Sequence, residues 1–346
     1  TPAVADLEGL GLGTIDHPLL DAAMEQADGI GAVTFTGRLS LRTHPWLADH
    51  SVFGNVLLPG SAFVDLALHA GDHTGHAHLV DLTLEAPLLV PEQGTVHLQM
   101  IVGSENADGE RPVTIHSRAG RDEPWALHAS GRLGTSAAGP AVDLSVWPPA
   151  GAEALPVETL YDDLAVKGYQ YGPVFQGLTA AWSSGDDVYA EIALGKDADP
   201  DGYGIHPALL DATLHALGLT RGTDQQDKDG NEKAQLPFSW SGVDLHATGA
   251  STVRAHLRHT SETTAEITLA DGAGRLVARI DSLSVRPVDT AQLAAAGTST
   301  HNRLFAVEWT PLTAVADASA TPEPVPHDLI LAGITPDGLT STTDTC

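Results

Sequence analysis

Cysteine is almost missing from this chain of 346 residues, because its single cysteine is the last residue, Cys346. One thiol cannot close an internal disulfide, and the same scarcity argues against a cysteine nucleophile. A chain without a disulfide framework is typical of a reducing compartment. We therefore expect a cytoplasmic protein whose chemistry uses other side chains.

Basic side chains are also few. The sequence holds 17 lysine and arginine residues against 45 aspartate and glutamate residues, which gives a formal net charge of −28. So acidic a chain is repelled by a phosphate backbone and by an anionic membrane surface. We therefore predict no nucleic acid and no membrane as a partner. An acidic protein partner would have to bind a local basic patch.

Long apolar runs are missing as well. No segment approaches the roughly 18 consecutive apolar residues that a membrane-spanning helix needs. Residues 1–6 lack the basic and apolar regions of an export signal, and the chain starts at Thr1 without an initiator methionine. We expect the sequence to be a piece cut from a longer polypeptide.

What the sequence does contain is alternation of apolar and polar residues. In residues 31–42 the apolar side chains fall on one face and threonine, serine and arginine on the other, which predicts a half-buried strand. Further strands are expected at residues 79–89, 95–102, 112–117 and 125–133, the last with Trp125, Leu127 and Leu133 on one face, and a helix at about 59–70, ended by Gly71. One helix among alternating strands indicates an antiparallel sheet curled around a central helix.

The same order of elements then recurs. Residues 136–156 are rich in glycine, proline and alanine and are predicted to be a linker. After a short helix at 157–166 come expected strands near 178–183, 188–194, 243–247, 252–259, 263–270 and 275–285, a helix at 206–219 and a mobile polar loop at 221–235. The repeated order suggests an internal duplication. We predict one domain over residues 1–135 and a second over 157–290.

His50 begins the most unusual stretch of the first half. Gly54 follows four residues later, and Pro59 stands where the helix is expected to begin. This order combines a titratable ring, a flexible backbone position and a rigid helix start. On local chemistry alone the stretch is a candidate site.

The helix of the second half carries a polar pair on an apolar background. Asp211 and His215 are four residues apart and share one face, and small residues flank them. One interpretation is an acid buried in a cavity. The other is an ion pair that faces solvent, and the residues alone do not decide between the two.

Four segments together resemble the dehydratase domains of modular polyketide synthases. His50, Gly54 and Pro59 match HxxxGxxxxP; residues 168–175, GYQYGPVF, match GYxYGPxF; residues 211–215, DATLH, match DxxxQ/H; and residues 236–240, LPFSW, match LPFxW. The motifs stand in the family's order over about residues 15–290. The resemblance implies an α+β double-hotdog fold, in which two antiparallel sheets each wrap a central helix. It also implies dehydration of a β-hydroxyacyl thioester.

The resemblance assigns roles to residues of each half. His50 would be the base that removes the proton next to the thioester carbonyl. Asp211 would be the acid that protonates the leaving hydroxyl, provided that a dry pocket keeps its carboxyl protonated. A backbone N–H near Gly54 and a helix N-terminus would face the thioester oxygen, as in an oxyanion hole.

Further residues of the motifs are expected to line the substrate site. Tyr169 or Tyr171, together with His215, would hold Asp211 or the substrate hydroxyl, and the choice between the two tyrosines stays open. Pro237 and Trp240 would shape the pocket wall. The other substrate-binding positions that the motifs imply are Gly54, Pro59, Gly172 and Phe175.

The resemblance also implies partners. The substrate would arrive on the phosphopantetheine arm of an acyl carrier protein, so that neither a metal nor a cofactor of the domain's own is needed. A homodimer is expected, because family members are usually dimeric within a dimeric synthase. Residues 304–312, LFAVEWTPL, resemble the start of the ketoreductase region that follows such a domain. Residues 291–346 are therefore expected to be a linker and the truncated start of that neighbour.

Alternatives to plain dehydration stay open. The domain could be a catalytically silent scaffold, because a fold does not establish an activity. It could also use the same pair of residues for epimerisation or for pyran ring closure. Double-bond isomerisation is disfavoured, since isomerising members tend to depart from the motifs at the proline and at the DxxxQ/H end, whereas Pro59 and His215 are both present.

Other polar residues are weaker candidates for a site. His69, His73, His76 and His78 lie close together in the sequence, the first two at the i, i+4 spacing of helical metal ligands. A solvated surface is the simpler interpretation, and we predict no metal. His44 competes with His50 as the base but lacks the glycine and proline context. Asp49 is expected to point away from His50 if the segment is extended.

One cluster of basic residues stands out in the second half, consisting of Arg254, Arg258, Arg275 and Arg279. Each pair is spaced by four residues, so each would lie on one face of its strand. The four could dock an acidic carrier protein. Alternatively, they are outward-facing strand positions with no partner protein.

Overall fold

The computed structural model describes residues 9, 11–27, 31–135, 143–220, 234–288 and 293. All of these belong to one compact unit, residues 1–301. The predicted start of a ketoreductase region and almost all of the predicted loop at 221–235 lie outside the described residues. In the described part of the chain, no helix has the length and apolar character that a membrane span requires.

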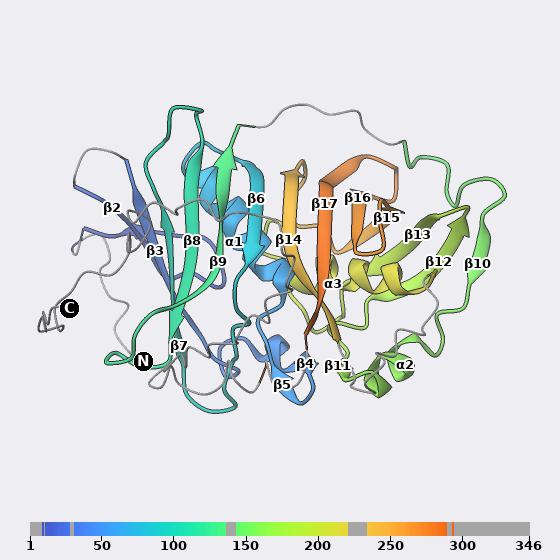
Figure 1. Ribbon diagram of the computed structural model, residues 1–346, viewed down its shortest axis with the longest axis horizontal. Coiled ribbons are helices and arrows are strands. Elements are labelled where there is room, and N and C mark those ends of the chain that lie inside the picture. The colour runs from blue at the N-terminus through green and yellow to red at the C-terminus, as the bar shows by residue number, and fades with distance from the viewer. Residues whose placement is uncertain are drawn as a thin grey trace, which may run out of the picture. The chain divides into compact units, whose positions relative to one another are not determined.

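The strands of both halves form one antiparallel sheet (Figure 1). Those of the first half are β1 (Gly13–Thr14), β2 (Ala22–Glu25), β3 (Val33–Leu39), β6 (His78–Leu84), β7 (Val96–Val102), β8 (Arg111–Arg118) and β9 (Ala126–Gly134). Those of the second half are β10 (Glu153–Leu155), β12 (Leu178–Ser184), β13 (Asp187–Ala193), β14 (Ala234–Leu245), β15 (Thr252–His259), β16 (Thr264–Ala270) and β17 (Leu276–Val288). Their spatial order is β1-β2-β3-β7-β8-β9-β6-β14-β17-β16-β15-β13-β12-β10.

This order repeats one unit about the junction between β6 and β14. The first half runs β2, β3, α1, β6, β7, β8, β9, and the second runs β12, β13, α3, β14, β15, β16, β17. In both, the strand that follows the helix lies at the centre of the whole sheet, where Ser239 faces Thr83 and Val243 faces Leu79. The structure thus repeats the order of elements that the sequence predicts, and the double-hotdog fold is confirmed, with the sheets of the two halves joined edge to edge into one.

Each half wraps its sheet around one helix, which is α1 (Gly60–His73) in the first half and α3 (Pro207–His215) in the second. Pro59 is the N-cap of α1, as its position in the sequence predicts. The helix continues two residues past Gly71, its predicted end. Gly71 is needed for another reason, since a Cβ there would lie 2.4 Å from the backbone oxygen of His76, where the chain returns across the helix.

The segment predicted as a linker contributes to the second half. Residues 153–155 form β10, which pairs with β12 at the edge of the sheet. Trp147 packs edge-on against Trp182 and Tyr189. A short helix, α2 (Leu160–Val166), follows β10 and precedes β11 (Tyr169–Tyr171).

Two strands differ from the predicted pattern because each contains a bulge. In β9 the register shifts opposite Ile115 and His116, so that Trp125 and Leu127, predicted on the face of Leu133, are 37% and 38% exposed. In β14 the register shifts between Pro237 and Ser239. This strand begins at Ala234, well before the predicted start at 243, and contains the whole LPFSW motif.

A second, small sheet joins the two halves at the candidate site. It consists of β4 (His50–Val52), β5 (Asn55–Val56) and β11 (Tyr169–Tyr171) in the order β11-β4-β5. Within it Tyr171 pairs with His50 and Tyr169 with Val52. This pairing places the GYxYGPxF segment beside the HxxxGxxxxP segment, although more than a hundred residues separate them in the chain.

Candidate active site

His50 is held rigidly at the start of β4. Its side chain is 6% exposed, and its Nδ1 lies 2.9 Å from the backbone oxygen of Leu57. A carbonyl oxygen can only accept, so the proton is on Nδ1 and Nε2 carries a lone pair. Burial lowers the pKa of His50 below its ordinary value of 6.5, although the nearby Asp211 carboxyl opposes that shift. The ring is therefore a neutral base at physiological pH.

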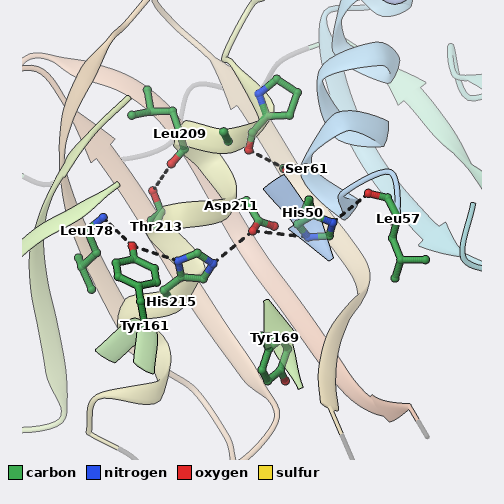
Figure 2. A network of polar contacts seen from close by, with 12 residues as sticks. His50, Leu57, Ser61, Tyr161, Tyr169, Leu178, Leu209, Asp211, Thr213 and His215 are labelled. Atoms are coloured by element: carbon green, nitrogen blue, oxygen red, sulfur yellow. Dashed lines mark hydrogen bonds and ion pairs between the residues drawn. The ribbon is translucent and has the colours of Figure 1, made fainter. Parts of the chain in front are cut away.

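Asp211 lies on α3 and faces this ring. Its Oδ2 is 3.8 Å from Nε2 of His50, and each of the two side chains is only 6% exposed (Figure 2). The two groups come from different halves of the chain. The alternative of an aspartate that faces solvent is wrong, because Asp211 is 4% exposed as a residue. The fold thus brings together the two residues that the sequence motifs predict to form the site.

His215 and a residue that the sequence analysis missed, Tyr161, complete the network. Nε2 of His215 lies 3.3 Å from Oδ2 of Asp211, and its Nδ1 lies 3.4 Å from the hydroxyl of Tyr161. The backbone N–H of Leu178 donates to that hydroxyl at 2.9 Å. The tyrosine O–H is therefore free to donate to Nδ1, which leaves the proton of His215 on Nε2, directed at Asp211 (Figure 2).

We expect Tyr161→Phe to lower kcat about tenfold and to leave KM within about twofold, because His215 loses the donor that fixes its tautomer. Steady-state kinetics with a β-hydroxyacyl thioester would measure this. A double-mutant cycle with His215→Gln separates this role from simple destabilisation. When residue 215 is glutamine, which has no ring tautomer to fix, Tyr161→Phe should lower kcat little further. Independent, multiplicative losses in the two variants would contradict the proposed coupling.

The two tyrosines of the GYxYGPxF segment have different surroundings. The hydroxyl of Tyr169 donates to the backbone oxygen of Gln235 at 3.0 Å and accepts that residue's N–H. The ring of Tyr171 lies 4.3 Å from the ring of His215. Burial raises the pKa of Tyr169 to about 12 and that of Tyr171 well above 10, so both stay protonated. Within the described residues, neither hydroxyl forms a hydrogen bond with Asp211.

Gly172 is explained by a close approach. A Cβ at this position would lie 2.3 Å from the carboxyl of Asp49, which accepts the backbone N–H of Val174 at 2.9 Å. The carboxyl of Asp49 therefore anchors the turn after β11, and the expectation that it does not pair with His50 agrees with this contact. Phe175, next in the turn, is fully buried with its ring 4.9 Å from that of His50.

The proline and tryptophan of the LPFxW motif lie on β14. A Cβ on Gly60, the first residue of α1, would meet Pro237 at 3.1 Å, so this proline packs against the start of that helix. Trp240 is fully buried opposite Leu82.

Pro59 offers no side-chain acceptor at the N-cap of α1. The first N–H groups of α1 are therefore not capped by a side chain of that residue.

Gly54 adopts a left-handed conformation with φ of 74° and is exposed. Its N–H, which the resemblance places near the thioester oxygen, donates to Oε1 of Gln170 at 2.9 Å. A Cβ at this position would have no atom of the described residues within 4 Å, so the positive φ alone favours glycine here.

The other histidines considered have partners of their own. Both ring nitrogens of His44 are engaged, with the hydroxyl of Thr43 and the backbone oxygen of Pro18, each at 2.9 Å. The rings of His69 and His73 pack against His17 and Phe35, while His76 and His78 lie near Glu105 and Asp244. His73 is exposed and His69 and His78 are partly exposed, whereas His76 is buried, so the predicted solvated surface is wrong for His76 alone. No metal-binding group of three or more such side chains occurs among the described residues.

The four arginines considered for docking are occupied within the domain. Arg254 reaches the backbone oxygen of Leu144 and lies over the ring of Trp147. The other three form ion pairs, Arg258 with Asp187 and Glu266, Arg275 with Asp271, and Arg279 with Asp281. These contacts favour the interpretation that they are ordinary outward strand positions.

His206 makes stability depend on pH. It is the N-cap of α3 and 1% exposed, and burial lowers its pKa from 6.5 to about 4. Between these two values the unfolded chain binds a proton that the folded chain does not. The free energy of unfolding should therefore fall by roughly 3 kcal/mol as pH is lowered from 7 to 4, from this group alone.

Thermal unfolding between pH 7 and pH 4 would measure this effect. His206→Asn is the matched variant, because asparagine is also a good N-cap and does not titrate. We expect its unfolding temperature to fall less steeply with acidification than that of the unaltered chain. Equal slopes would show that His206 is not the responsible group.

Comparisons with known proteins agree with this geometry. The profile described as polyketide synthase dehydratase domain matches residues 17–118, and that described as polyketide synthase dehydratase N-terminal domain matches residues 139–295. Polyketide synthase GfsE of Streptomyces halstedii is 48% identical over 324 residues, which are 91% of this chain and 8% of GfsE. The chain thus corresponds to a small part of that relative.

Solved structures match over nearly their whole length. A dehydratase structure from work on substrate selection by the borrelidin and fluvirucin polyketide synthases is 46% identical, with a TM-score of 0.76, covering 82% of this chain and 100% of that one. Two inactive mutants of the CurK dehydratase, one with His changed to Phe and one with Asp changed to Asn, are each 25% identical with a TM-score of 0.70, covering 80% and 79% of this chain and 99% of each of those. The chain therefore belongs to the family of polyketide synthase dehydratase domains.

Proposed function

We propose that this domain removes water from a β-hydroxyacyl thioester to give the α,β-unsaturated thioester, with His50 as base and Asp211 as acid. One observation carries the proposal: Nε2 of His50 and Oδ2 of Asp211 face each other at 3.8 Å in a buried site. A β-hydroxyacyl group between a base and an acid can lose its α-proton to one and its hydroxyl to the other.

The chemical step balances with these two residues alone. His50 takes the α-proton on Nε2 while its Nδ1–H stays on the oxygen of Leu57. The C–O bond to the β-hydroxyl breaks, and the proton of Asp211 goes to the departing oxygen, so that water leaves. The imidazolium and carboxylate that remain lie 3.8 Å apart, and transfer of one proton between them restores the starting state.

Developing charge on the thioester oxygen would be met at the start of α1. Pro59 leaves the first N–H groups of that helix without a side-chain cap, and a helix N-terminus carries a partial positive charge. The N–H of Gly54 is a second candidate donor. It is bound to Gln170 in the structure, so this side chain would have to turn away before Gly54 could serve.

The expected partners follow from this assignment. The substrate is carried on the phosphopantetheine arm of an acyl carrier protein, and the domain needs no cofactor of its own. The curated relatives are much longer polyketide synthases, of which the chain spans 8% in GfsE, which supports neighbouring domains in the same polypeptide. A homodimer in the cytoplasm is part of the same proposal.

A silent scaffold with the same fold is the main alternative. The two CurK mutants, with a His-to-Phe and an Asp-to-Asn change, are described as inactive, which supports a role for such residues in that protein. Incubation of this chain with β-hydroxyacyl thioesters of N-acetylcysteamine, followed by mass spectrometry, tests the proposal. Loss of one water is expected. No loss with any thioester of several chain lengths would favour the scaffold.

A further inference from the structure

Helix α3 is bound to α1 through buried polar contacts at its very start. The hydroxyl of Ser61 donates to the backbone oxygen of Pro207 at 2.8 Å, and Oδ1 of Asp65 accepts the backbone N–H of Ile205 at 2.9 Å. Ser61 and Asp65 are four residues apart and therefore lie on one face of α1. Each is at most 1% exposed, so water cannot replace these bonds.

Asp65 is a fixed anchor rather than a second catalytic acid. Its Oδ2 lies 2.8 Å from Nε2 of His17, and both side chains are fully buried. The backbone N–H of Leu19 donates to Nδ1 of His17 at 3.1 Å, so the ring is neutral and its proton is directed at Asp65. The carboxylate thus has donors on both oxygens and is held in place from two sides.

Ser61 contacts the start of α3, where a small shift of this helix would move Asp211 relative to His50. Pro207, which it holds, lies one helical turn before Asp211 on α3, and the loop that carries His50 leads directly into α1. Without this hydroxyl, α3 keeps its anchor at Asp65 and can pivot about it. A movement of the start of α3 then changes the distance between Asp211 and His50.

We infer that Ser61 is a positioning residue, which sets the separation of Asp211 and His50 by holding the carbonyl of Pro207. This inference rests on the proposed function for its effect on turnover. The position of α3, however, can be measured without turnover. Figure 2 shows the hydrogen bond that runs from Ser61, on α1, to α3, the helix that carries Asp211.

Ser61→Ala tests the inference, with Thr213→Val as its matched control. The hydroxyl of Thr213 donates at 3.1 Å to the oxygen of Leu209, a bond that stays within α3. Ser61 and Thr213 are both fully buried, and each substitution removes one hydroxyl with little change of shape. We expect similar decreases of the unfolding temperature. Only Ser61→Ala should lower kcat, about tenfold with KM within about twofold, because misplacement of reacting groups costs rate.

A titration of the His50 ring by NMR, assigned through its loss in His50→Phe, gives the readout without turnover. The groups around this ring are Asp211, His215, Tyr171 and Phe175. In Ser61→Ala the midpoint should shift, because the Asp211 carboxyl, which raises the pKa of His50, changes its distance from the ring, whereas Thr213→Val should leave it unchanged. If the unaltered chain does not dehydrate thioesters, the proposed function fails while this shift still supports the positioning role. An unchanged His50 midpoint in Ser61→Ala overturns the inference.

Discussion

Asp211→Asn should lower kcat for dehydration by about a thousandfold or more and leave the fold intact. Hydroxide is a poor leaving group, so the reaction depends on a proton supplied to the departing oxygen, and an amide cannot supply it. The substitution is nearly isosteric in a site where the side chain is 6% exposed. Initial rates with a β-hydroxyacyl thioester and the unfolding temperature would measure both effects.

The matched control for this prediction is Asp244→Asn. Asp244 is also buried and also lies against a histidine, with its Oδ1 2.9 Å from Nδ1 of His78, but it is on β14 outside the network of Figure 2. We expect this variant to keep kcat within about twofold. A comparable loss of rate in both variants would mean that removal of any buried carboxyl disables the domain, and Asp211 would lose its assignment as the acid.

His50→Phe should abolish turnover, by at least about a thousandfold, because phenylalanine fills the same space without a nitrogen to accept the α-proton. The base role makes a second prediction. In D2O the unaltered domain should exchange the α-hydrogen of its thioester substrate or product, and His50→Phe should not. Mass spectrometry of recovered thioester measures this exchange.

His44→Phe is the control that decides between the two histidines that the sequence offers as the base. Both nitrogens of His44 are engaged by Thr43 and Pro18, so this ring has no free lone pair for a substrate. We expect turnover and exchange in this variant to stay within about twofold of the unaltered chain. Exchange that persists in His50→Phe and disappears in His44→Phe would reverse the assignment.

The fold was predictable where side-chain patterning is local. Alternation in residues 31–42 identified β3, and Pro59 marked the start of α1. The pattern failed where a bulge inserts one residue into a strand, because the side chains on one side of the bulge then change from one face of the sheet to the other. A bulge in β9 turns Leu127 outward, and the bulge after Pro237 lets a proline stand inside β14, where sequence rules argue against a strand.

The candidate site was predictable only in part, because some of its contacts depend on how segments far apart in the sequence pack together. His50 and Asp211 stand in recognisable motifs, so their pairing was expected. Tyr161 lies on a short helix directly before two aspartates, and nothing in its neighbours shows that its hydroxyl reaches His215. Contacts such as that of Ser61 with Pro207 depend on how two helices pack, which patterning along one chain does not encode.

The pairing of β6 with β14 has a consequence for engineering. These strands hold the two halves in one sheet, and β14 alone is 12 residues long. Either half produced by itself would present this edge as unpaired backbone, a template for aggregation. A chimaera that takes one hotdog from a relative must therefore preserve the complementarity of this seam as well as the catalytic pair.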